Sequence, residues 1–192
     1  MDRVEIFSER THSLANNCEE EYKVIRAFPE YSLENLVELS ACLLEMLDKF
    51  LLSSDDSDED CLKYLNDTAK LAQVGMMGYR FTLGDDIPFT RIANQMVDTY
   101  KRKNADYGDS FSESLDRYGA VAAHVRISDK INRLRSLVVR KQTAQVKDES
   151  IADTFLDLAC YAIMRLVYIE MKSETIEEEK EEEECTLSIL DC

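Results

Sequence analysis

Residues 32–52, SLENLVELSACLLEMLDKFLL, carry the clearest fold signal in the chain. Apolar side chains recur there every three or four residues, which is the spacing that lines one face of an α-helix. Ser32 precedes the run and is a preferred N-cap residue, because its hydroxyl oxygen can accept a hydrogen bond from a free backbone N–H. The stretch predicts an amphipathic helix. Its apolar face is expected to consist of Leu36, Leu39, Leu43, Leu47 and Phe50.

The same helical spacing extends over most of the chain. The 192 residues include only five glycines and two prolines, which disfavours sandwiches, barrels and Rossmann-type sheets because these need frequent turns. We expect one all-α domain, a bundle of about six helices, over residues 1–173, followed by an acidic tail over residues 174–192. The helices are expected near residues 3–27, 33–52, 61–80, 89–104, 113–141 and 149–172.

The charge is strongly negative and unevenly distributed. The chain has 39 acidic and 23 basic residues, a formal net charge of −16. Residues 174–192 hold nine acids and one lysine, so half of the excess lies in the tail, which is expected to be disordered or a fraying helix end. Such acidity argues against non-specific binding of nucleic acid, but a local basic stripe could still hold a small phosphorylated ligand.

Cysteine usage and hydropathy bear on location. The six cysteines form no CxxC pair and predict free thiols in a reducing, cytoplasmic environment. The N-terminus does not have the pattern of a signal peptide, and no stretch has the ~18 consecutive apolar residues of a membrane-spanning helix. We therefore expect no membrane association.

Three isolated features leave alternatives open. Residues 53–60, SSDDSDED, are expected to form a solvated loop; a calcium loop is the alternative, although the glycine and final glutamate of an EF-hand cannot be aligned. Residues 82–86, TLGDD, are either an ordinary turn or an anion or metal contact. His124 is expected to be a core or helix-contact residue and not a catalyst.

A charged turn is expected over residues 105–112. Gly108 can adopt a positive φ there, and Lys103, Asp106 and Tyr107 precede it. Tyr107 could stack on a nucleotide base while Lys103 contacts phosphate. Alternatively, Tyr107 fills the core beneath a simple turn between two helices.

The helix expected over residues 113–141 should begin at a capping box of Ser110 and Glu113. It carries three cations and one acid at positions i, i+3, i+4 and i+7. These residues are Arg126, Asp129, Lys130 and Arg133. Such a group suits phosphate, because Arg donates through a fork and Lys presents a point charge. The alternative is an intrahelical ladder of surface salt bridges.

In the last expected helix, Glu149, Asp153 and Asp157 stand at i, i+4 and i+8, so their carboxylates lie about one turn apart on one face. Their mutual repulsion would be relieved by a divalent cation, which predicts a Mg²⁺ site. The alternative is a solvated face opposite an apolar stripe, with Asp148 as the N-cap. The apolar stripe consists of Ile151, Phe155, Leu158, Ala162 and Leu166.

Three segments taken together, KNADYGDSF (103–111), RISDKINRL (126–134) and DESIADTFLDLACYA (148–162), resemble the nucleotide modification associated domain 1 family of bacteria and phages. The resemblance covers about residues 95–165. That family is in turn distantly similar to the all-α MazG and dimeric dUTPase-like pyrophosphatases, which hydrolyse nucleoside triphosphates with Mg²⁺ held by helical acids.

The resemblance implies a nucleoside triphosphate ligand, a Mg²⁺ cofactor and a homo-oligomer. The pyrophosphatase motifs EExxE and ExxD are altered here, since Glu149 and Asp153 form ExxxD and the basic face of residues 126–133 replaces EExxE. Glu149 and Asp153 are the expected catalytic residues and, with Asp129, the expected metal ligands. The expected substrate-binding residues are Lys103, Asp106, Tyr107, Arg126, Lys130 and Arg133.

Two functions follow from these patterns. The first is a nucleotide-binding protein that hydrolyses nucleoside triphosphates with Mg²⁺ in nucleotide or DNA-modification metabolism. The second is a non-catalytic acidic protein, of phage or bacterial origin, that binds a basic protein partner or mimics nucleic acid. The first requires Asp129, Glu149 and Asp153 to converge in one cleft, whereas the second lets them point apart into solvent.

Overall fold

The computed structural model describes residues 2–27, 32–50, 59–85, 87–143 and 150–190. Within these residues the chain forms seven α-helices and no β-strand, which confirms the all-α fold class. The helices are α1 (Arg3–Ala27), α2 (Leu33–Leu47), α3 (Glu59–Thr82), α4 (Phe89–Tyr107), α5 (Ser110–Tyr118), α6 (Val121–Leu134) and α7 (Ile151–Leu190). A 3-10 turn, η1 (Asp48–Phe50), follows α2, and a π-helical turn, η2 (Arg135–Val139), follows α6.

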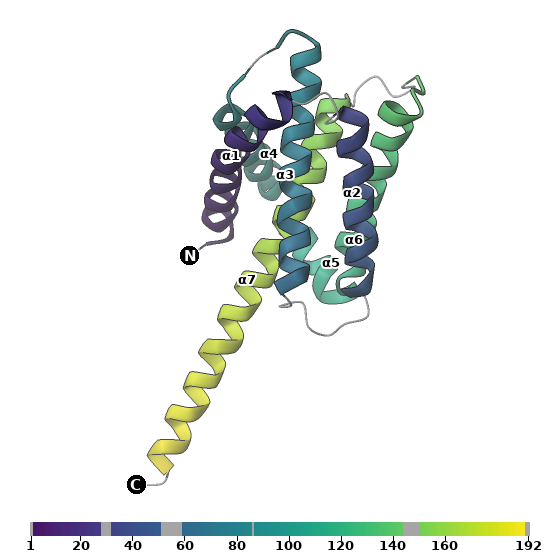
Figure 1. The fold of residues 1–192 in the computed structure, drawn as a ribbon. Helices are drawn as coiled ribbons and strands as arrows, with labels where there is room; N and C mark the ends of the chain where they lie inside the picture. Colours follow the sequence, from purple (N-terminus) through teal and green to yellow (C-terminus); the bar gives the residue numbers. More distant parts are fainter. Residues whose placement is uncertain (1, 28–31, 51–58, 86, 144–149, 191–192) are drawn as a thin grey trace.

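Helices α3 and α7 pack against each other at the centre of the bundle (Figure 1). Helix α1 packs on α4 at one flank, and α2 packs on α3 and α6 at the other. Large apolar side chains from these helices, such as Phe7, Leu65, Met96 and Leu158, are fully buried between them. Burial of this apolar area is the main contribution to the stability of the bundle.

Helix α2 confirms most of the prediction made from residues 32–52, but it ends at Leu47, so Phe50 lies in η1 and is only partly buried. The Ser32 hydroxyl accepts a hydrogen bond from the Asn35 backbone N–H at 3.2 Å, so Ser32 is the N-cap. Leu39, however, is 49% exposed and does not belong to the core face. The buried face includes Val37 and Ala41, and it is therefore rotated away from the side of the helix that carries Leu39.

The prediction of a single helix over residues 113–141 is wrong, because the chain turns at Gly119. This glycine has φ of 68°, a backbone conformation that L-amino acids rarely adopt, and it separates α5 from α6. The predicted capping box is also wrong. The N-cap of α5 is Asp109, which makes no side-chain cap hydrogen bond, and Ser110 already lies inside the helix.

The predicted turn over residues 105–112 is shorter in the structure. Helix α4 continues to Tyr107, three residues beyond its predicted end, and only Gly108 and Asp109 separate it from α5. Gly108 has φ of 62°, as predicted for this position. The turn is tight because one glycine reverses the backbone without steric cost.

Helix α7 starts with a capping box that was not predicted. The Ser150 hydroxyl accepts a hydrogen bond from the Asp153 backbone N–H at 3.1 Å, and the Asp153 carboxylate accepts one from the Ser150 N–H at 3.0 Å. The predicted stripe of Phe155, Leu158 and Leu166 is buried. The helix includes residues 174–190, and this end projects away from the bundle (Figure 1).

Some predictions fall outside the described residues. These are most of the loop or calcium site predicted at residues 53–60, the N-cap Asp148 and the site residue Glu149. Glu59 and Asp60, the last two residues of that predicted loop, already belong to α3. Among the described helices, none combines the length and the apolar character needed to cross a membrane. His124 is a helix contact as predicted, since its Nε2 lies 2.7 Å from the Asp48 carboxylate of η1.

Candidate functional site

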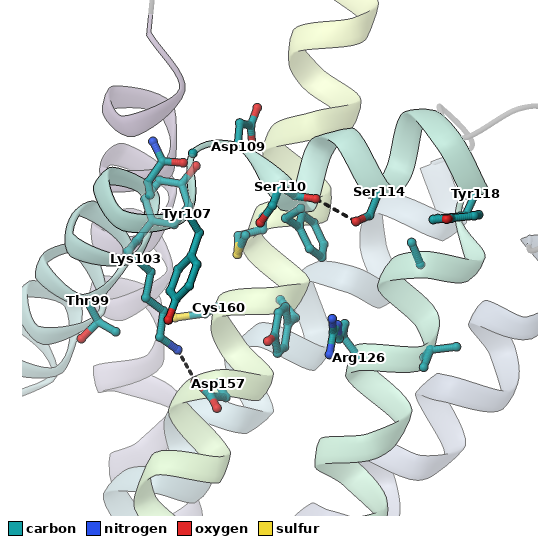
Figure 2. Close-up of a pocket in the computed structure, with 18 of the residues that line it drawn as sticks. Thr99, Lys103, Tyr107, Asp109, Ser110, Ser114, Tyr118, Arg126, Asp157 and Cys160 are labelled. Carbon is teal, nitrogen blue, oxygen red and sulfur yellow. Dashed lines mark hydrogen bonds and ion pairs between the residues drawn. The ribbon is translucent and has the colours of Figure 1, made fainter.

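The two glycine turns at Gly108 and Gly119 bend α4, α5 and α6 around one side of α7. A cavity of about 940 Å³, here called the aromatic cavity, lies between these four helices (Figure 2). Its aromatic lining consists of Tyr100, Tyr107, Phe111, Tyr118 and Tyr161. Its aliphatic lining includes Val121, Ala122, Val125 and Met164. A cavity with a largely apolar wall and few polar groups is typical of a small-molecule site.

The aromatic rings stand at different depths in this cavity. Tyr107 and Tyr118 are 73% and 64% exposed, which is unusual for residues of this size and places them at the rim. Phe111 and Tyr161 are more enclosed, and their ring centroids lie 5.8 Å apart. The exposure of Tyr107 contradicts the alternative in which it fills the core. The rings offer a flat planar group several faces on which to stack.

Asp157 of α7 is the central polar group of the aromatic cavity. Its carboxylate lies 3.4 Å from the Lys103 ammonium of α4 and 2.8 Å from the Lys130 ammonium of α6. One acid thus connects three helices. It also holds the tip of Lys103 against the cavity wall, where Figure 2 shows the bond between the two side chains.

Arg126 lies on the wall opposite Lys103 (Figure 2). It projects from α6 and is exposed, with Val121 and Val125 on the same stretch of lining. A guanidinium group can donate two parallel hydrogen bonds to a phosphate or carboxylate. The cavity therefore has a cation on each side of its apolar wall.

Helix α1 fixes the rim of the aromatic cavity from outside. The Arg3 guanidinium forms an ion pair with the Asp109 carboxylate and donates a hydrogen bond to the Ser112 hydroxyl at 2.7 Å. Asp109 follows Gly108 in the turn between α4 and α5. The contact holds in place the turn that carries Tyr107 and Ser110 into the cavity.

Cys160 lines the cavity, but its thiol has low nucleophilic reactivity. The pKa of its thiol is raised to about 12, mainly by burial and in smaller part by the nearby Asp157 carboxylate, whereas Lys103 lowers it. A thiol with so high a pKa is protonated at neutral pH and is a poor nucleophile. Cys160 is therefore part of the wall and not a reactive group.

The structure brings four of the six predicted substrate-binding residues to the aromatic cavity, three in its lining and one behind it, and places the other two elsewhere. Lys103, Tyr107 and Arg126 line the aromatic cavity, and Lys130 supports it through Asp157. Asp106 is exposed and does not belong to the lining. Arg133 donates from its Nε to the Thr154 hydroxyl of α7 at 3.1 Å, which is a contact between helices.

The predicted metal ligands are only partly described. Asp129 is exposed on α6, Asp153 takes part in the capping box of α7, and Glu149 lies outside the described residues. Within the described part of the chain, no group of three or more His, Cys, Asp or Glu side chains could hold a metal ion. The described residues alone do not fit a Mg²⁺ site, and that prediction depends on Glu149.

A second cavity of about 640 Å³ adjoins the first, and Thr99 lines both. It lies between α3, α4 and the start of α7. Its charged lining consists of Arg80, Asp98, Lys101, Arg102 and Asp153. Arg80 also donates from its Nε to the Asp85 carboxylate at 2.9 Å, so this acid of the predicted TLGDD turn pairs with a cation of its own chain.

Sequence reasoning missed the role of Asp157 and the rings of Phe111, Tyr118 and Tyr161. Asp157 was recognised only as one acid of a helical stripe, because its partners Lys103 and Lys130 are distant in sequence. The helical spacing of the sequence did not indicate that these rings share a cavity. Tyr118, for example, reaches the rim only because the chain turns at Gly119. The density of tyrosine and phenylalanine over residues 107–118 was the available indication.

A comparison with protein families identifies the segment that forms most of this cavity. The model of the family described as Nucleotide modification associated domain 1 matches residues 103–171. No curated protein and no solved structure matches the chain. The predicted resemblance is confirmed for this segment, which runs from the last turn of α4 to Met171 in α7 and includes Lys103, Arg126 and Asp157.

Proposed function

We propose that this chain, whose residues 103–171 match the nucleotide modification associated domain 1 family, binds a nucleotide in the aromatic cavity. The observation that carries the proposal is the presence, in one cavity, of stacking surfaces for a base and of cations for a phosphate. The family's association with nucleotide modification supports the same ligand class. The aromatic and aliphatic side chains would contact the base and sugar, and the two cations would contact the phosphate.

The base and sugar fit the apolar part of the cavity. Stacking of a base on an aromatic side chain contributes about 1–3 kcal/mol in other proteins. Tyr107 and Tyr118 are available at the rim, and Phe111 and Tyr161 form a pair of rings in the interior. A planar base that stacks on one of these rings would remove apolar surface from water on the stacked face.

The cations that can contact a phosphate are Arg126 and Lys103, which lie on opposite walls of the cavity. Arg126 is exposed and can turn its fork of N–H donors toward a ligand. Lys103 can leave Asp157 for a phosphate oxygen, because Asp157 keeps its 2.8 Å ion pair with Lys130. The site can therefore gain a ligand contact without leaving a half-buried carboxylate unpaired.

Hydrolysis of a nucleoside triphosphate with Mg²⁺ is a further proposal that the binding function does not require. It would use Asp129, Glu149 and Asp153, and the described residues do not complete such a site. Release of pyrophosphate from nucleoside triphosphates, measured with Mg²⁺ present, tests it. A rate that falls after Glu149→Gln would support catalysis, and no release above a buffer blank would leave binding as the function.

The binding proposal is tested by thermal unfolding and calorimetric titration with nucleosides and nucleotides of all common bases. Arg126→Gln is the test variant, and Arg140→Gln, an exposed arginine away from the cavity, is the matched control. We expect Arg126→Gln to weaken binding about 10-fold or more, as for loss of a charge-assisted hydrogen bond, and Arg140→Gln to bind as wild type. If no nucleotide binds wild type, the proposal is wrong.

An acidic interaction protein is the second candidate function. The observation in its favour is helix α7, which projects from the bundle and contains the glutamate run of residues 177–184 (Figure 1).

A homo-oligomer is implied by the family resemblance, and light scattering of the purified protein tests it. The four described cysteines are free thiols, which suits a reducing compartment such as the cytoplasm.

A further inference from the structure

We infer that the aromatic cavity selects a nucleoside monophosphate over the corresponding triphosphate, an inference that rests on the proposed nucleotide-binding function. It departs from the triphosphate that the family resemblance implies. Four observations carry it: the number of cations in the lining, the way the acids are bonded, the apolar character of the remaining wall, and the balanced charge of the adjoining cavity.

The charged lining of the aromatic cavity matches a single phosphate group. Its cations are Lys103 and Arg126, and its acids are Asp109 and Asp157. Asp109 is neutralised from outside the cavity by Arg3, and Asp157 is held by Lys130 as well as by Lys103. Two cations are thus available to a ligand. A phosphate monoester carries about −1.5 to −2 charges at neutral pH, which these cations can compensate.

The remaining wall disfavours any further phosphate. Aromatic and aliphatic side chains make up most of the lining around Lys103 and Arg126. Each additional phosphoryl group brings more negative charge, and transfer of an uncompensated charge from water to an apolar surface is costly. Thr99, Asn104, Ser110 and Ser114 also line the cavity and can donate neutral hydrogen bonds. None of them carries a positive charge that could offset a second and third phosphate.

The second cavity does not supply the missing cations. It adjoins the aromatic cavity at Thr99 and is the nearest described place for an extended phosphate chain. Arg80 is already bonded to Asp85, and the two other cations, Lys101 and Arg102, share the lining with the acids Asp98 and Asp153. Cations and acids are therefore balanced there, and no positive excess attracts the additional phosphates.

The test is a calorimetric titration of the full chain with a matched series of one base: nucleoside, mono-, di- and triphosphate. Each titration is run with a chelator and again with Mg²⁺. We expect the monophosphate to bind about 10-fold or more tightly than both the nucleoside and the triphosphate. Arg126→Gln and Lys103→Gln should each reduce the preference for monophosphate over nucleoside, because each removes one phosphate contact.

The Lys101→Gln variant tests whether the second cavity contributes to binding, since Lys101 lines the second cavity and not the first. We expect it to leave the affinity of every member of the series unchanged. Triphosphate binding that is tighter than monophosphate binding, in either metal condition, overturns the inference, as does loss of triphosphate affinity in Lys101→Gln. If no member of the series binds, the proposed function itself fails. If the nucleoside binds more tightly than all three of its phosphates, the proposed base site is supported and the proposed phosphate site is wrong.

Discussion

At the scale of single residues, the partner of a charged side chain determines its role more than its position in a pattern does. Asp153 and Asp157 stand one turn apart on α7 and looked equivalent in the sequence. In the structure Asp153 bonds backward to Ser150 and caps the helix, whereas Asp157 bonds across to Lys103 and Lys130. Only the second carboxylate therefore belongs to the candidate site.

His124 should make the stability of the protein sensitive to mild acid. Burial lowers its pKa below the ordinary value of about 6.5, the Asp48 carboxylate opposes this shift, and Arg165 adds to it. The unfolded state therefore binds more protons than the folded state as the pH falls through about 6.5. The contribution of His124 to stability is present above that pH and is lost below it.

We predict that the free energy of unfolding decreases more between about pH 7.5 and pH 5.5 in wild type than in His124→Gln. Urea unfolding at the two pH values measures this difference. His12→Gln is the matched control, because it replaces the other histidine of the chain. An equal pH dependence in wild type and His124→Gln would contradict the assignment.

At the scale of elements, the central contact between α3 and α7 depends on a glycine. A Cβ atom at Gly75 would lie 2.8 Å from Cζ and 2.9 Å from Cδ1 of the Phe155 ring, closer than side-chain carbons normally approach. Phe155 is almost completely buried and has little room to move. The two helices can approach at this point because residue 75 has no side chain.

We predict that Gly75→Ala destabilises the fold by about 1–3 kcal/mol, the usual cost of overpacking a core. Gly78→Ala is the matched control on the same helix, since the nearest atom to its added Cβ is Leu33 Cδ1 at 3.9 Å. This control should be neutral or stabilising by up to about 1 kcal/mol, because alanine favours a helix interior over glycine. Urea unfolding distinguishes the two variants, and equal stabilities would contradict the contact.

At the scale of the whole molecule, the candidate site depends on parts of the chain outside the family match. Residues 103–171 supply α5, α6 and the bundled part of α7. Arg3 of α1 holds the rim at Asp109, and Asp48 of η1 contacts His124 of α6. The first hundred residues thus form the scaffold that positions the matched segment.

The projecting end of α7 should be dispensable for folding and for nucleotide binding. It lies beyond the bundle in Figure 1, and the last buried side chain described on α7 is Ile169. We predict that deletion of residues 174–192 changes the free energy of unfolding by no more than about 0.5 kcal/mol, as is usual for surface changes. Nucleotide affinity should also be unchanged. A loss of either would show that the tail packs on the bundle or reaches the cavity.

The local signals of the sequence determined the elements of this protein. Apolar spacing predicted an all-α chain, and the bounds of α1 and the N-cap Ser32 of α2 were predicted correctly. These features depend on interactions between residues a few positions apart, which a sequence shows directly. The family resemblance likewise rests on contiguous segments, and it identified the segment that contains most of the cavity.

The tertiary structure alone decided how these elements make a site. The break at Gly119 follows from a positive φ, and a glycine in a sequence does not reveal which φ it adopts. The pairing of Asp157 with Lys103 and Lys130 joins residues far apart in the chain, so no periodic pattern records it. Both features arise when α7 packs against its neighbours, because packing determines which polar groups meet at the same cavity.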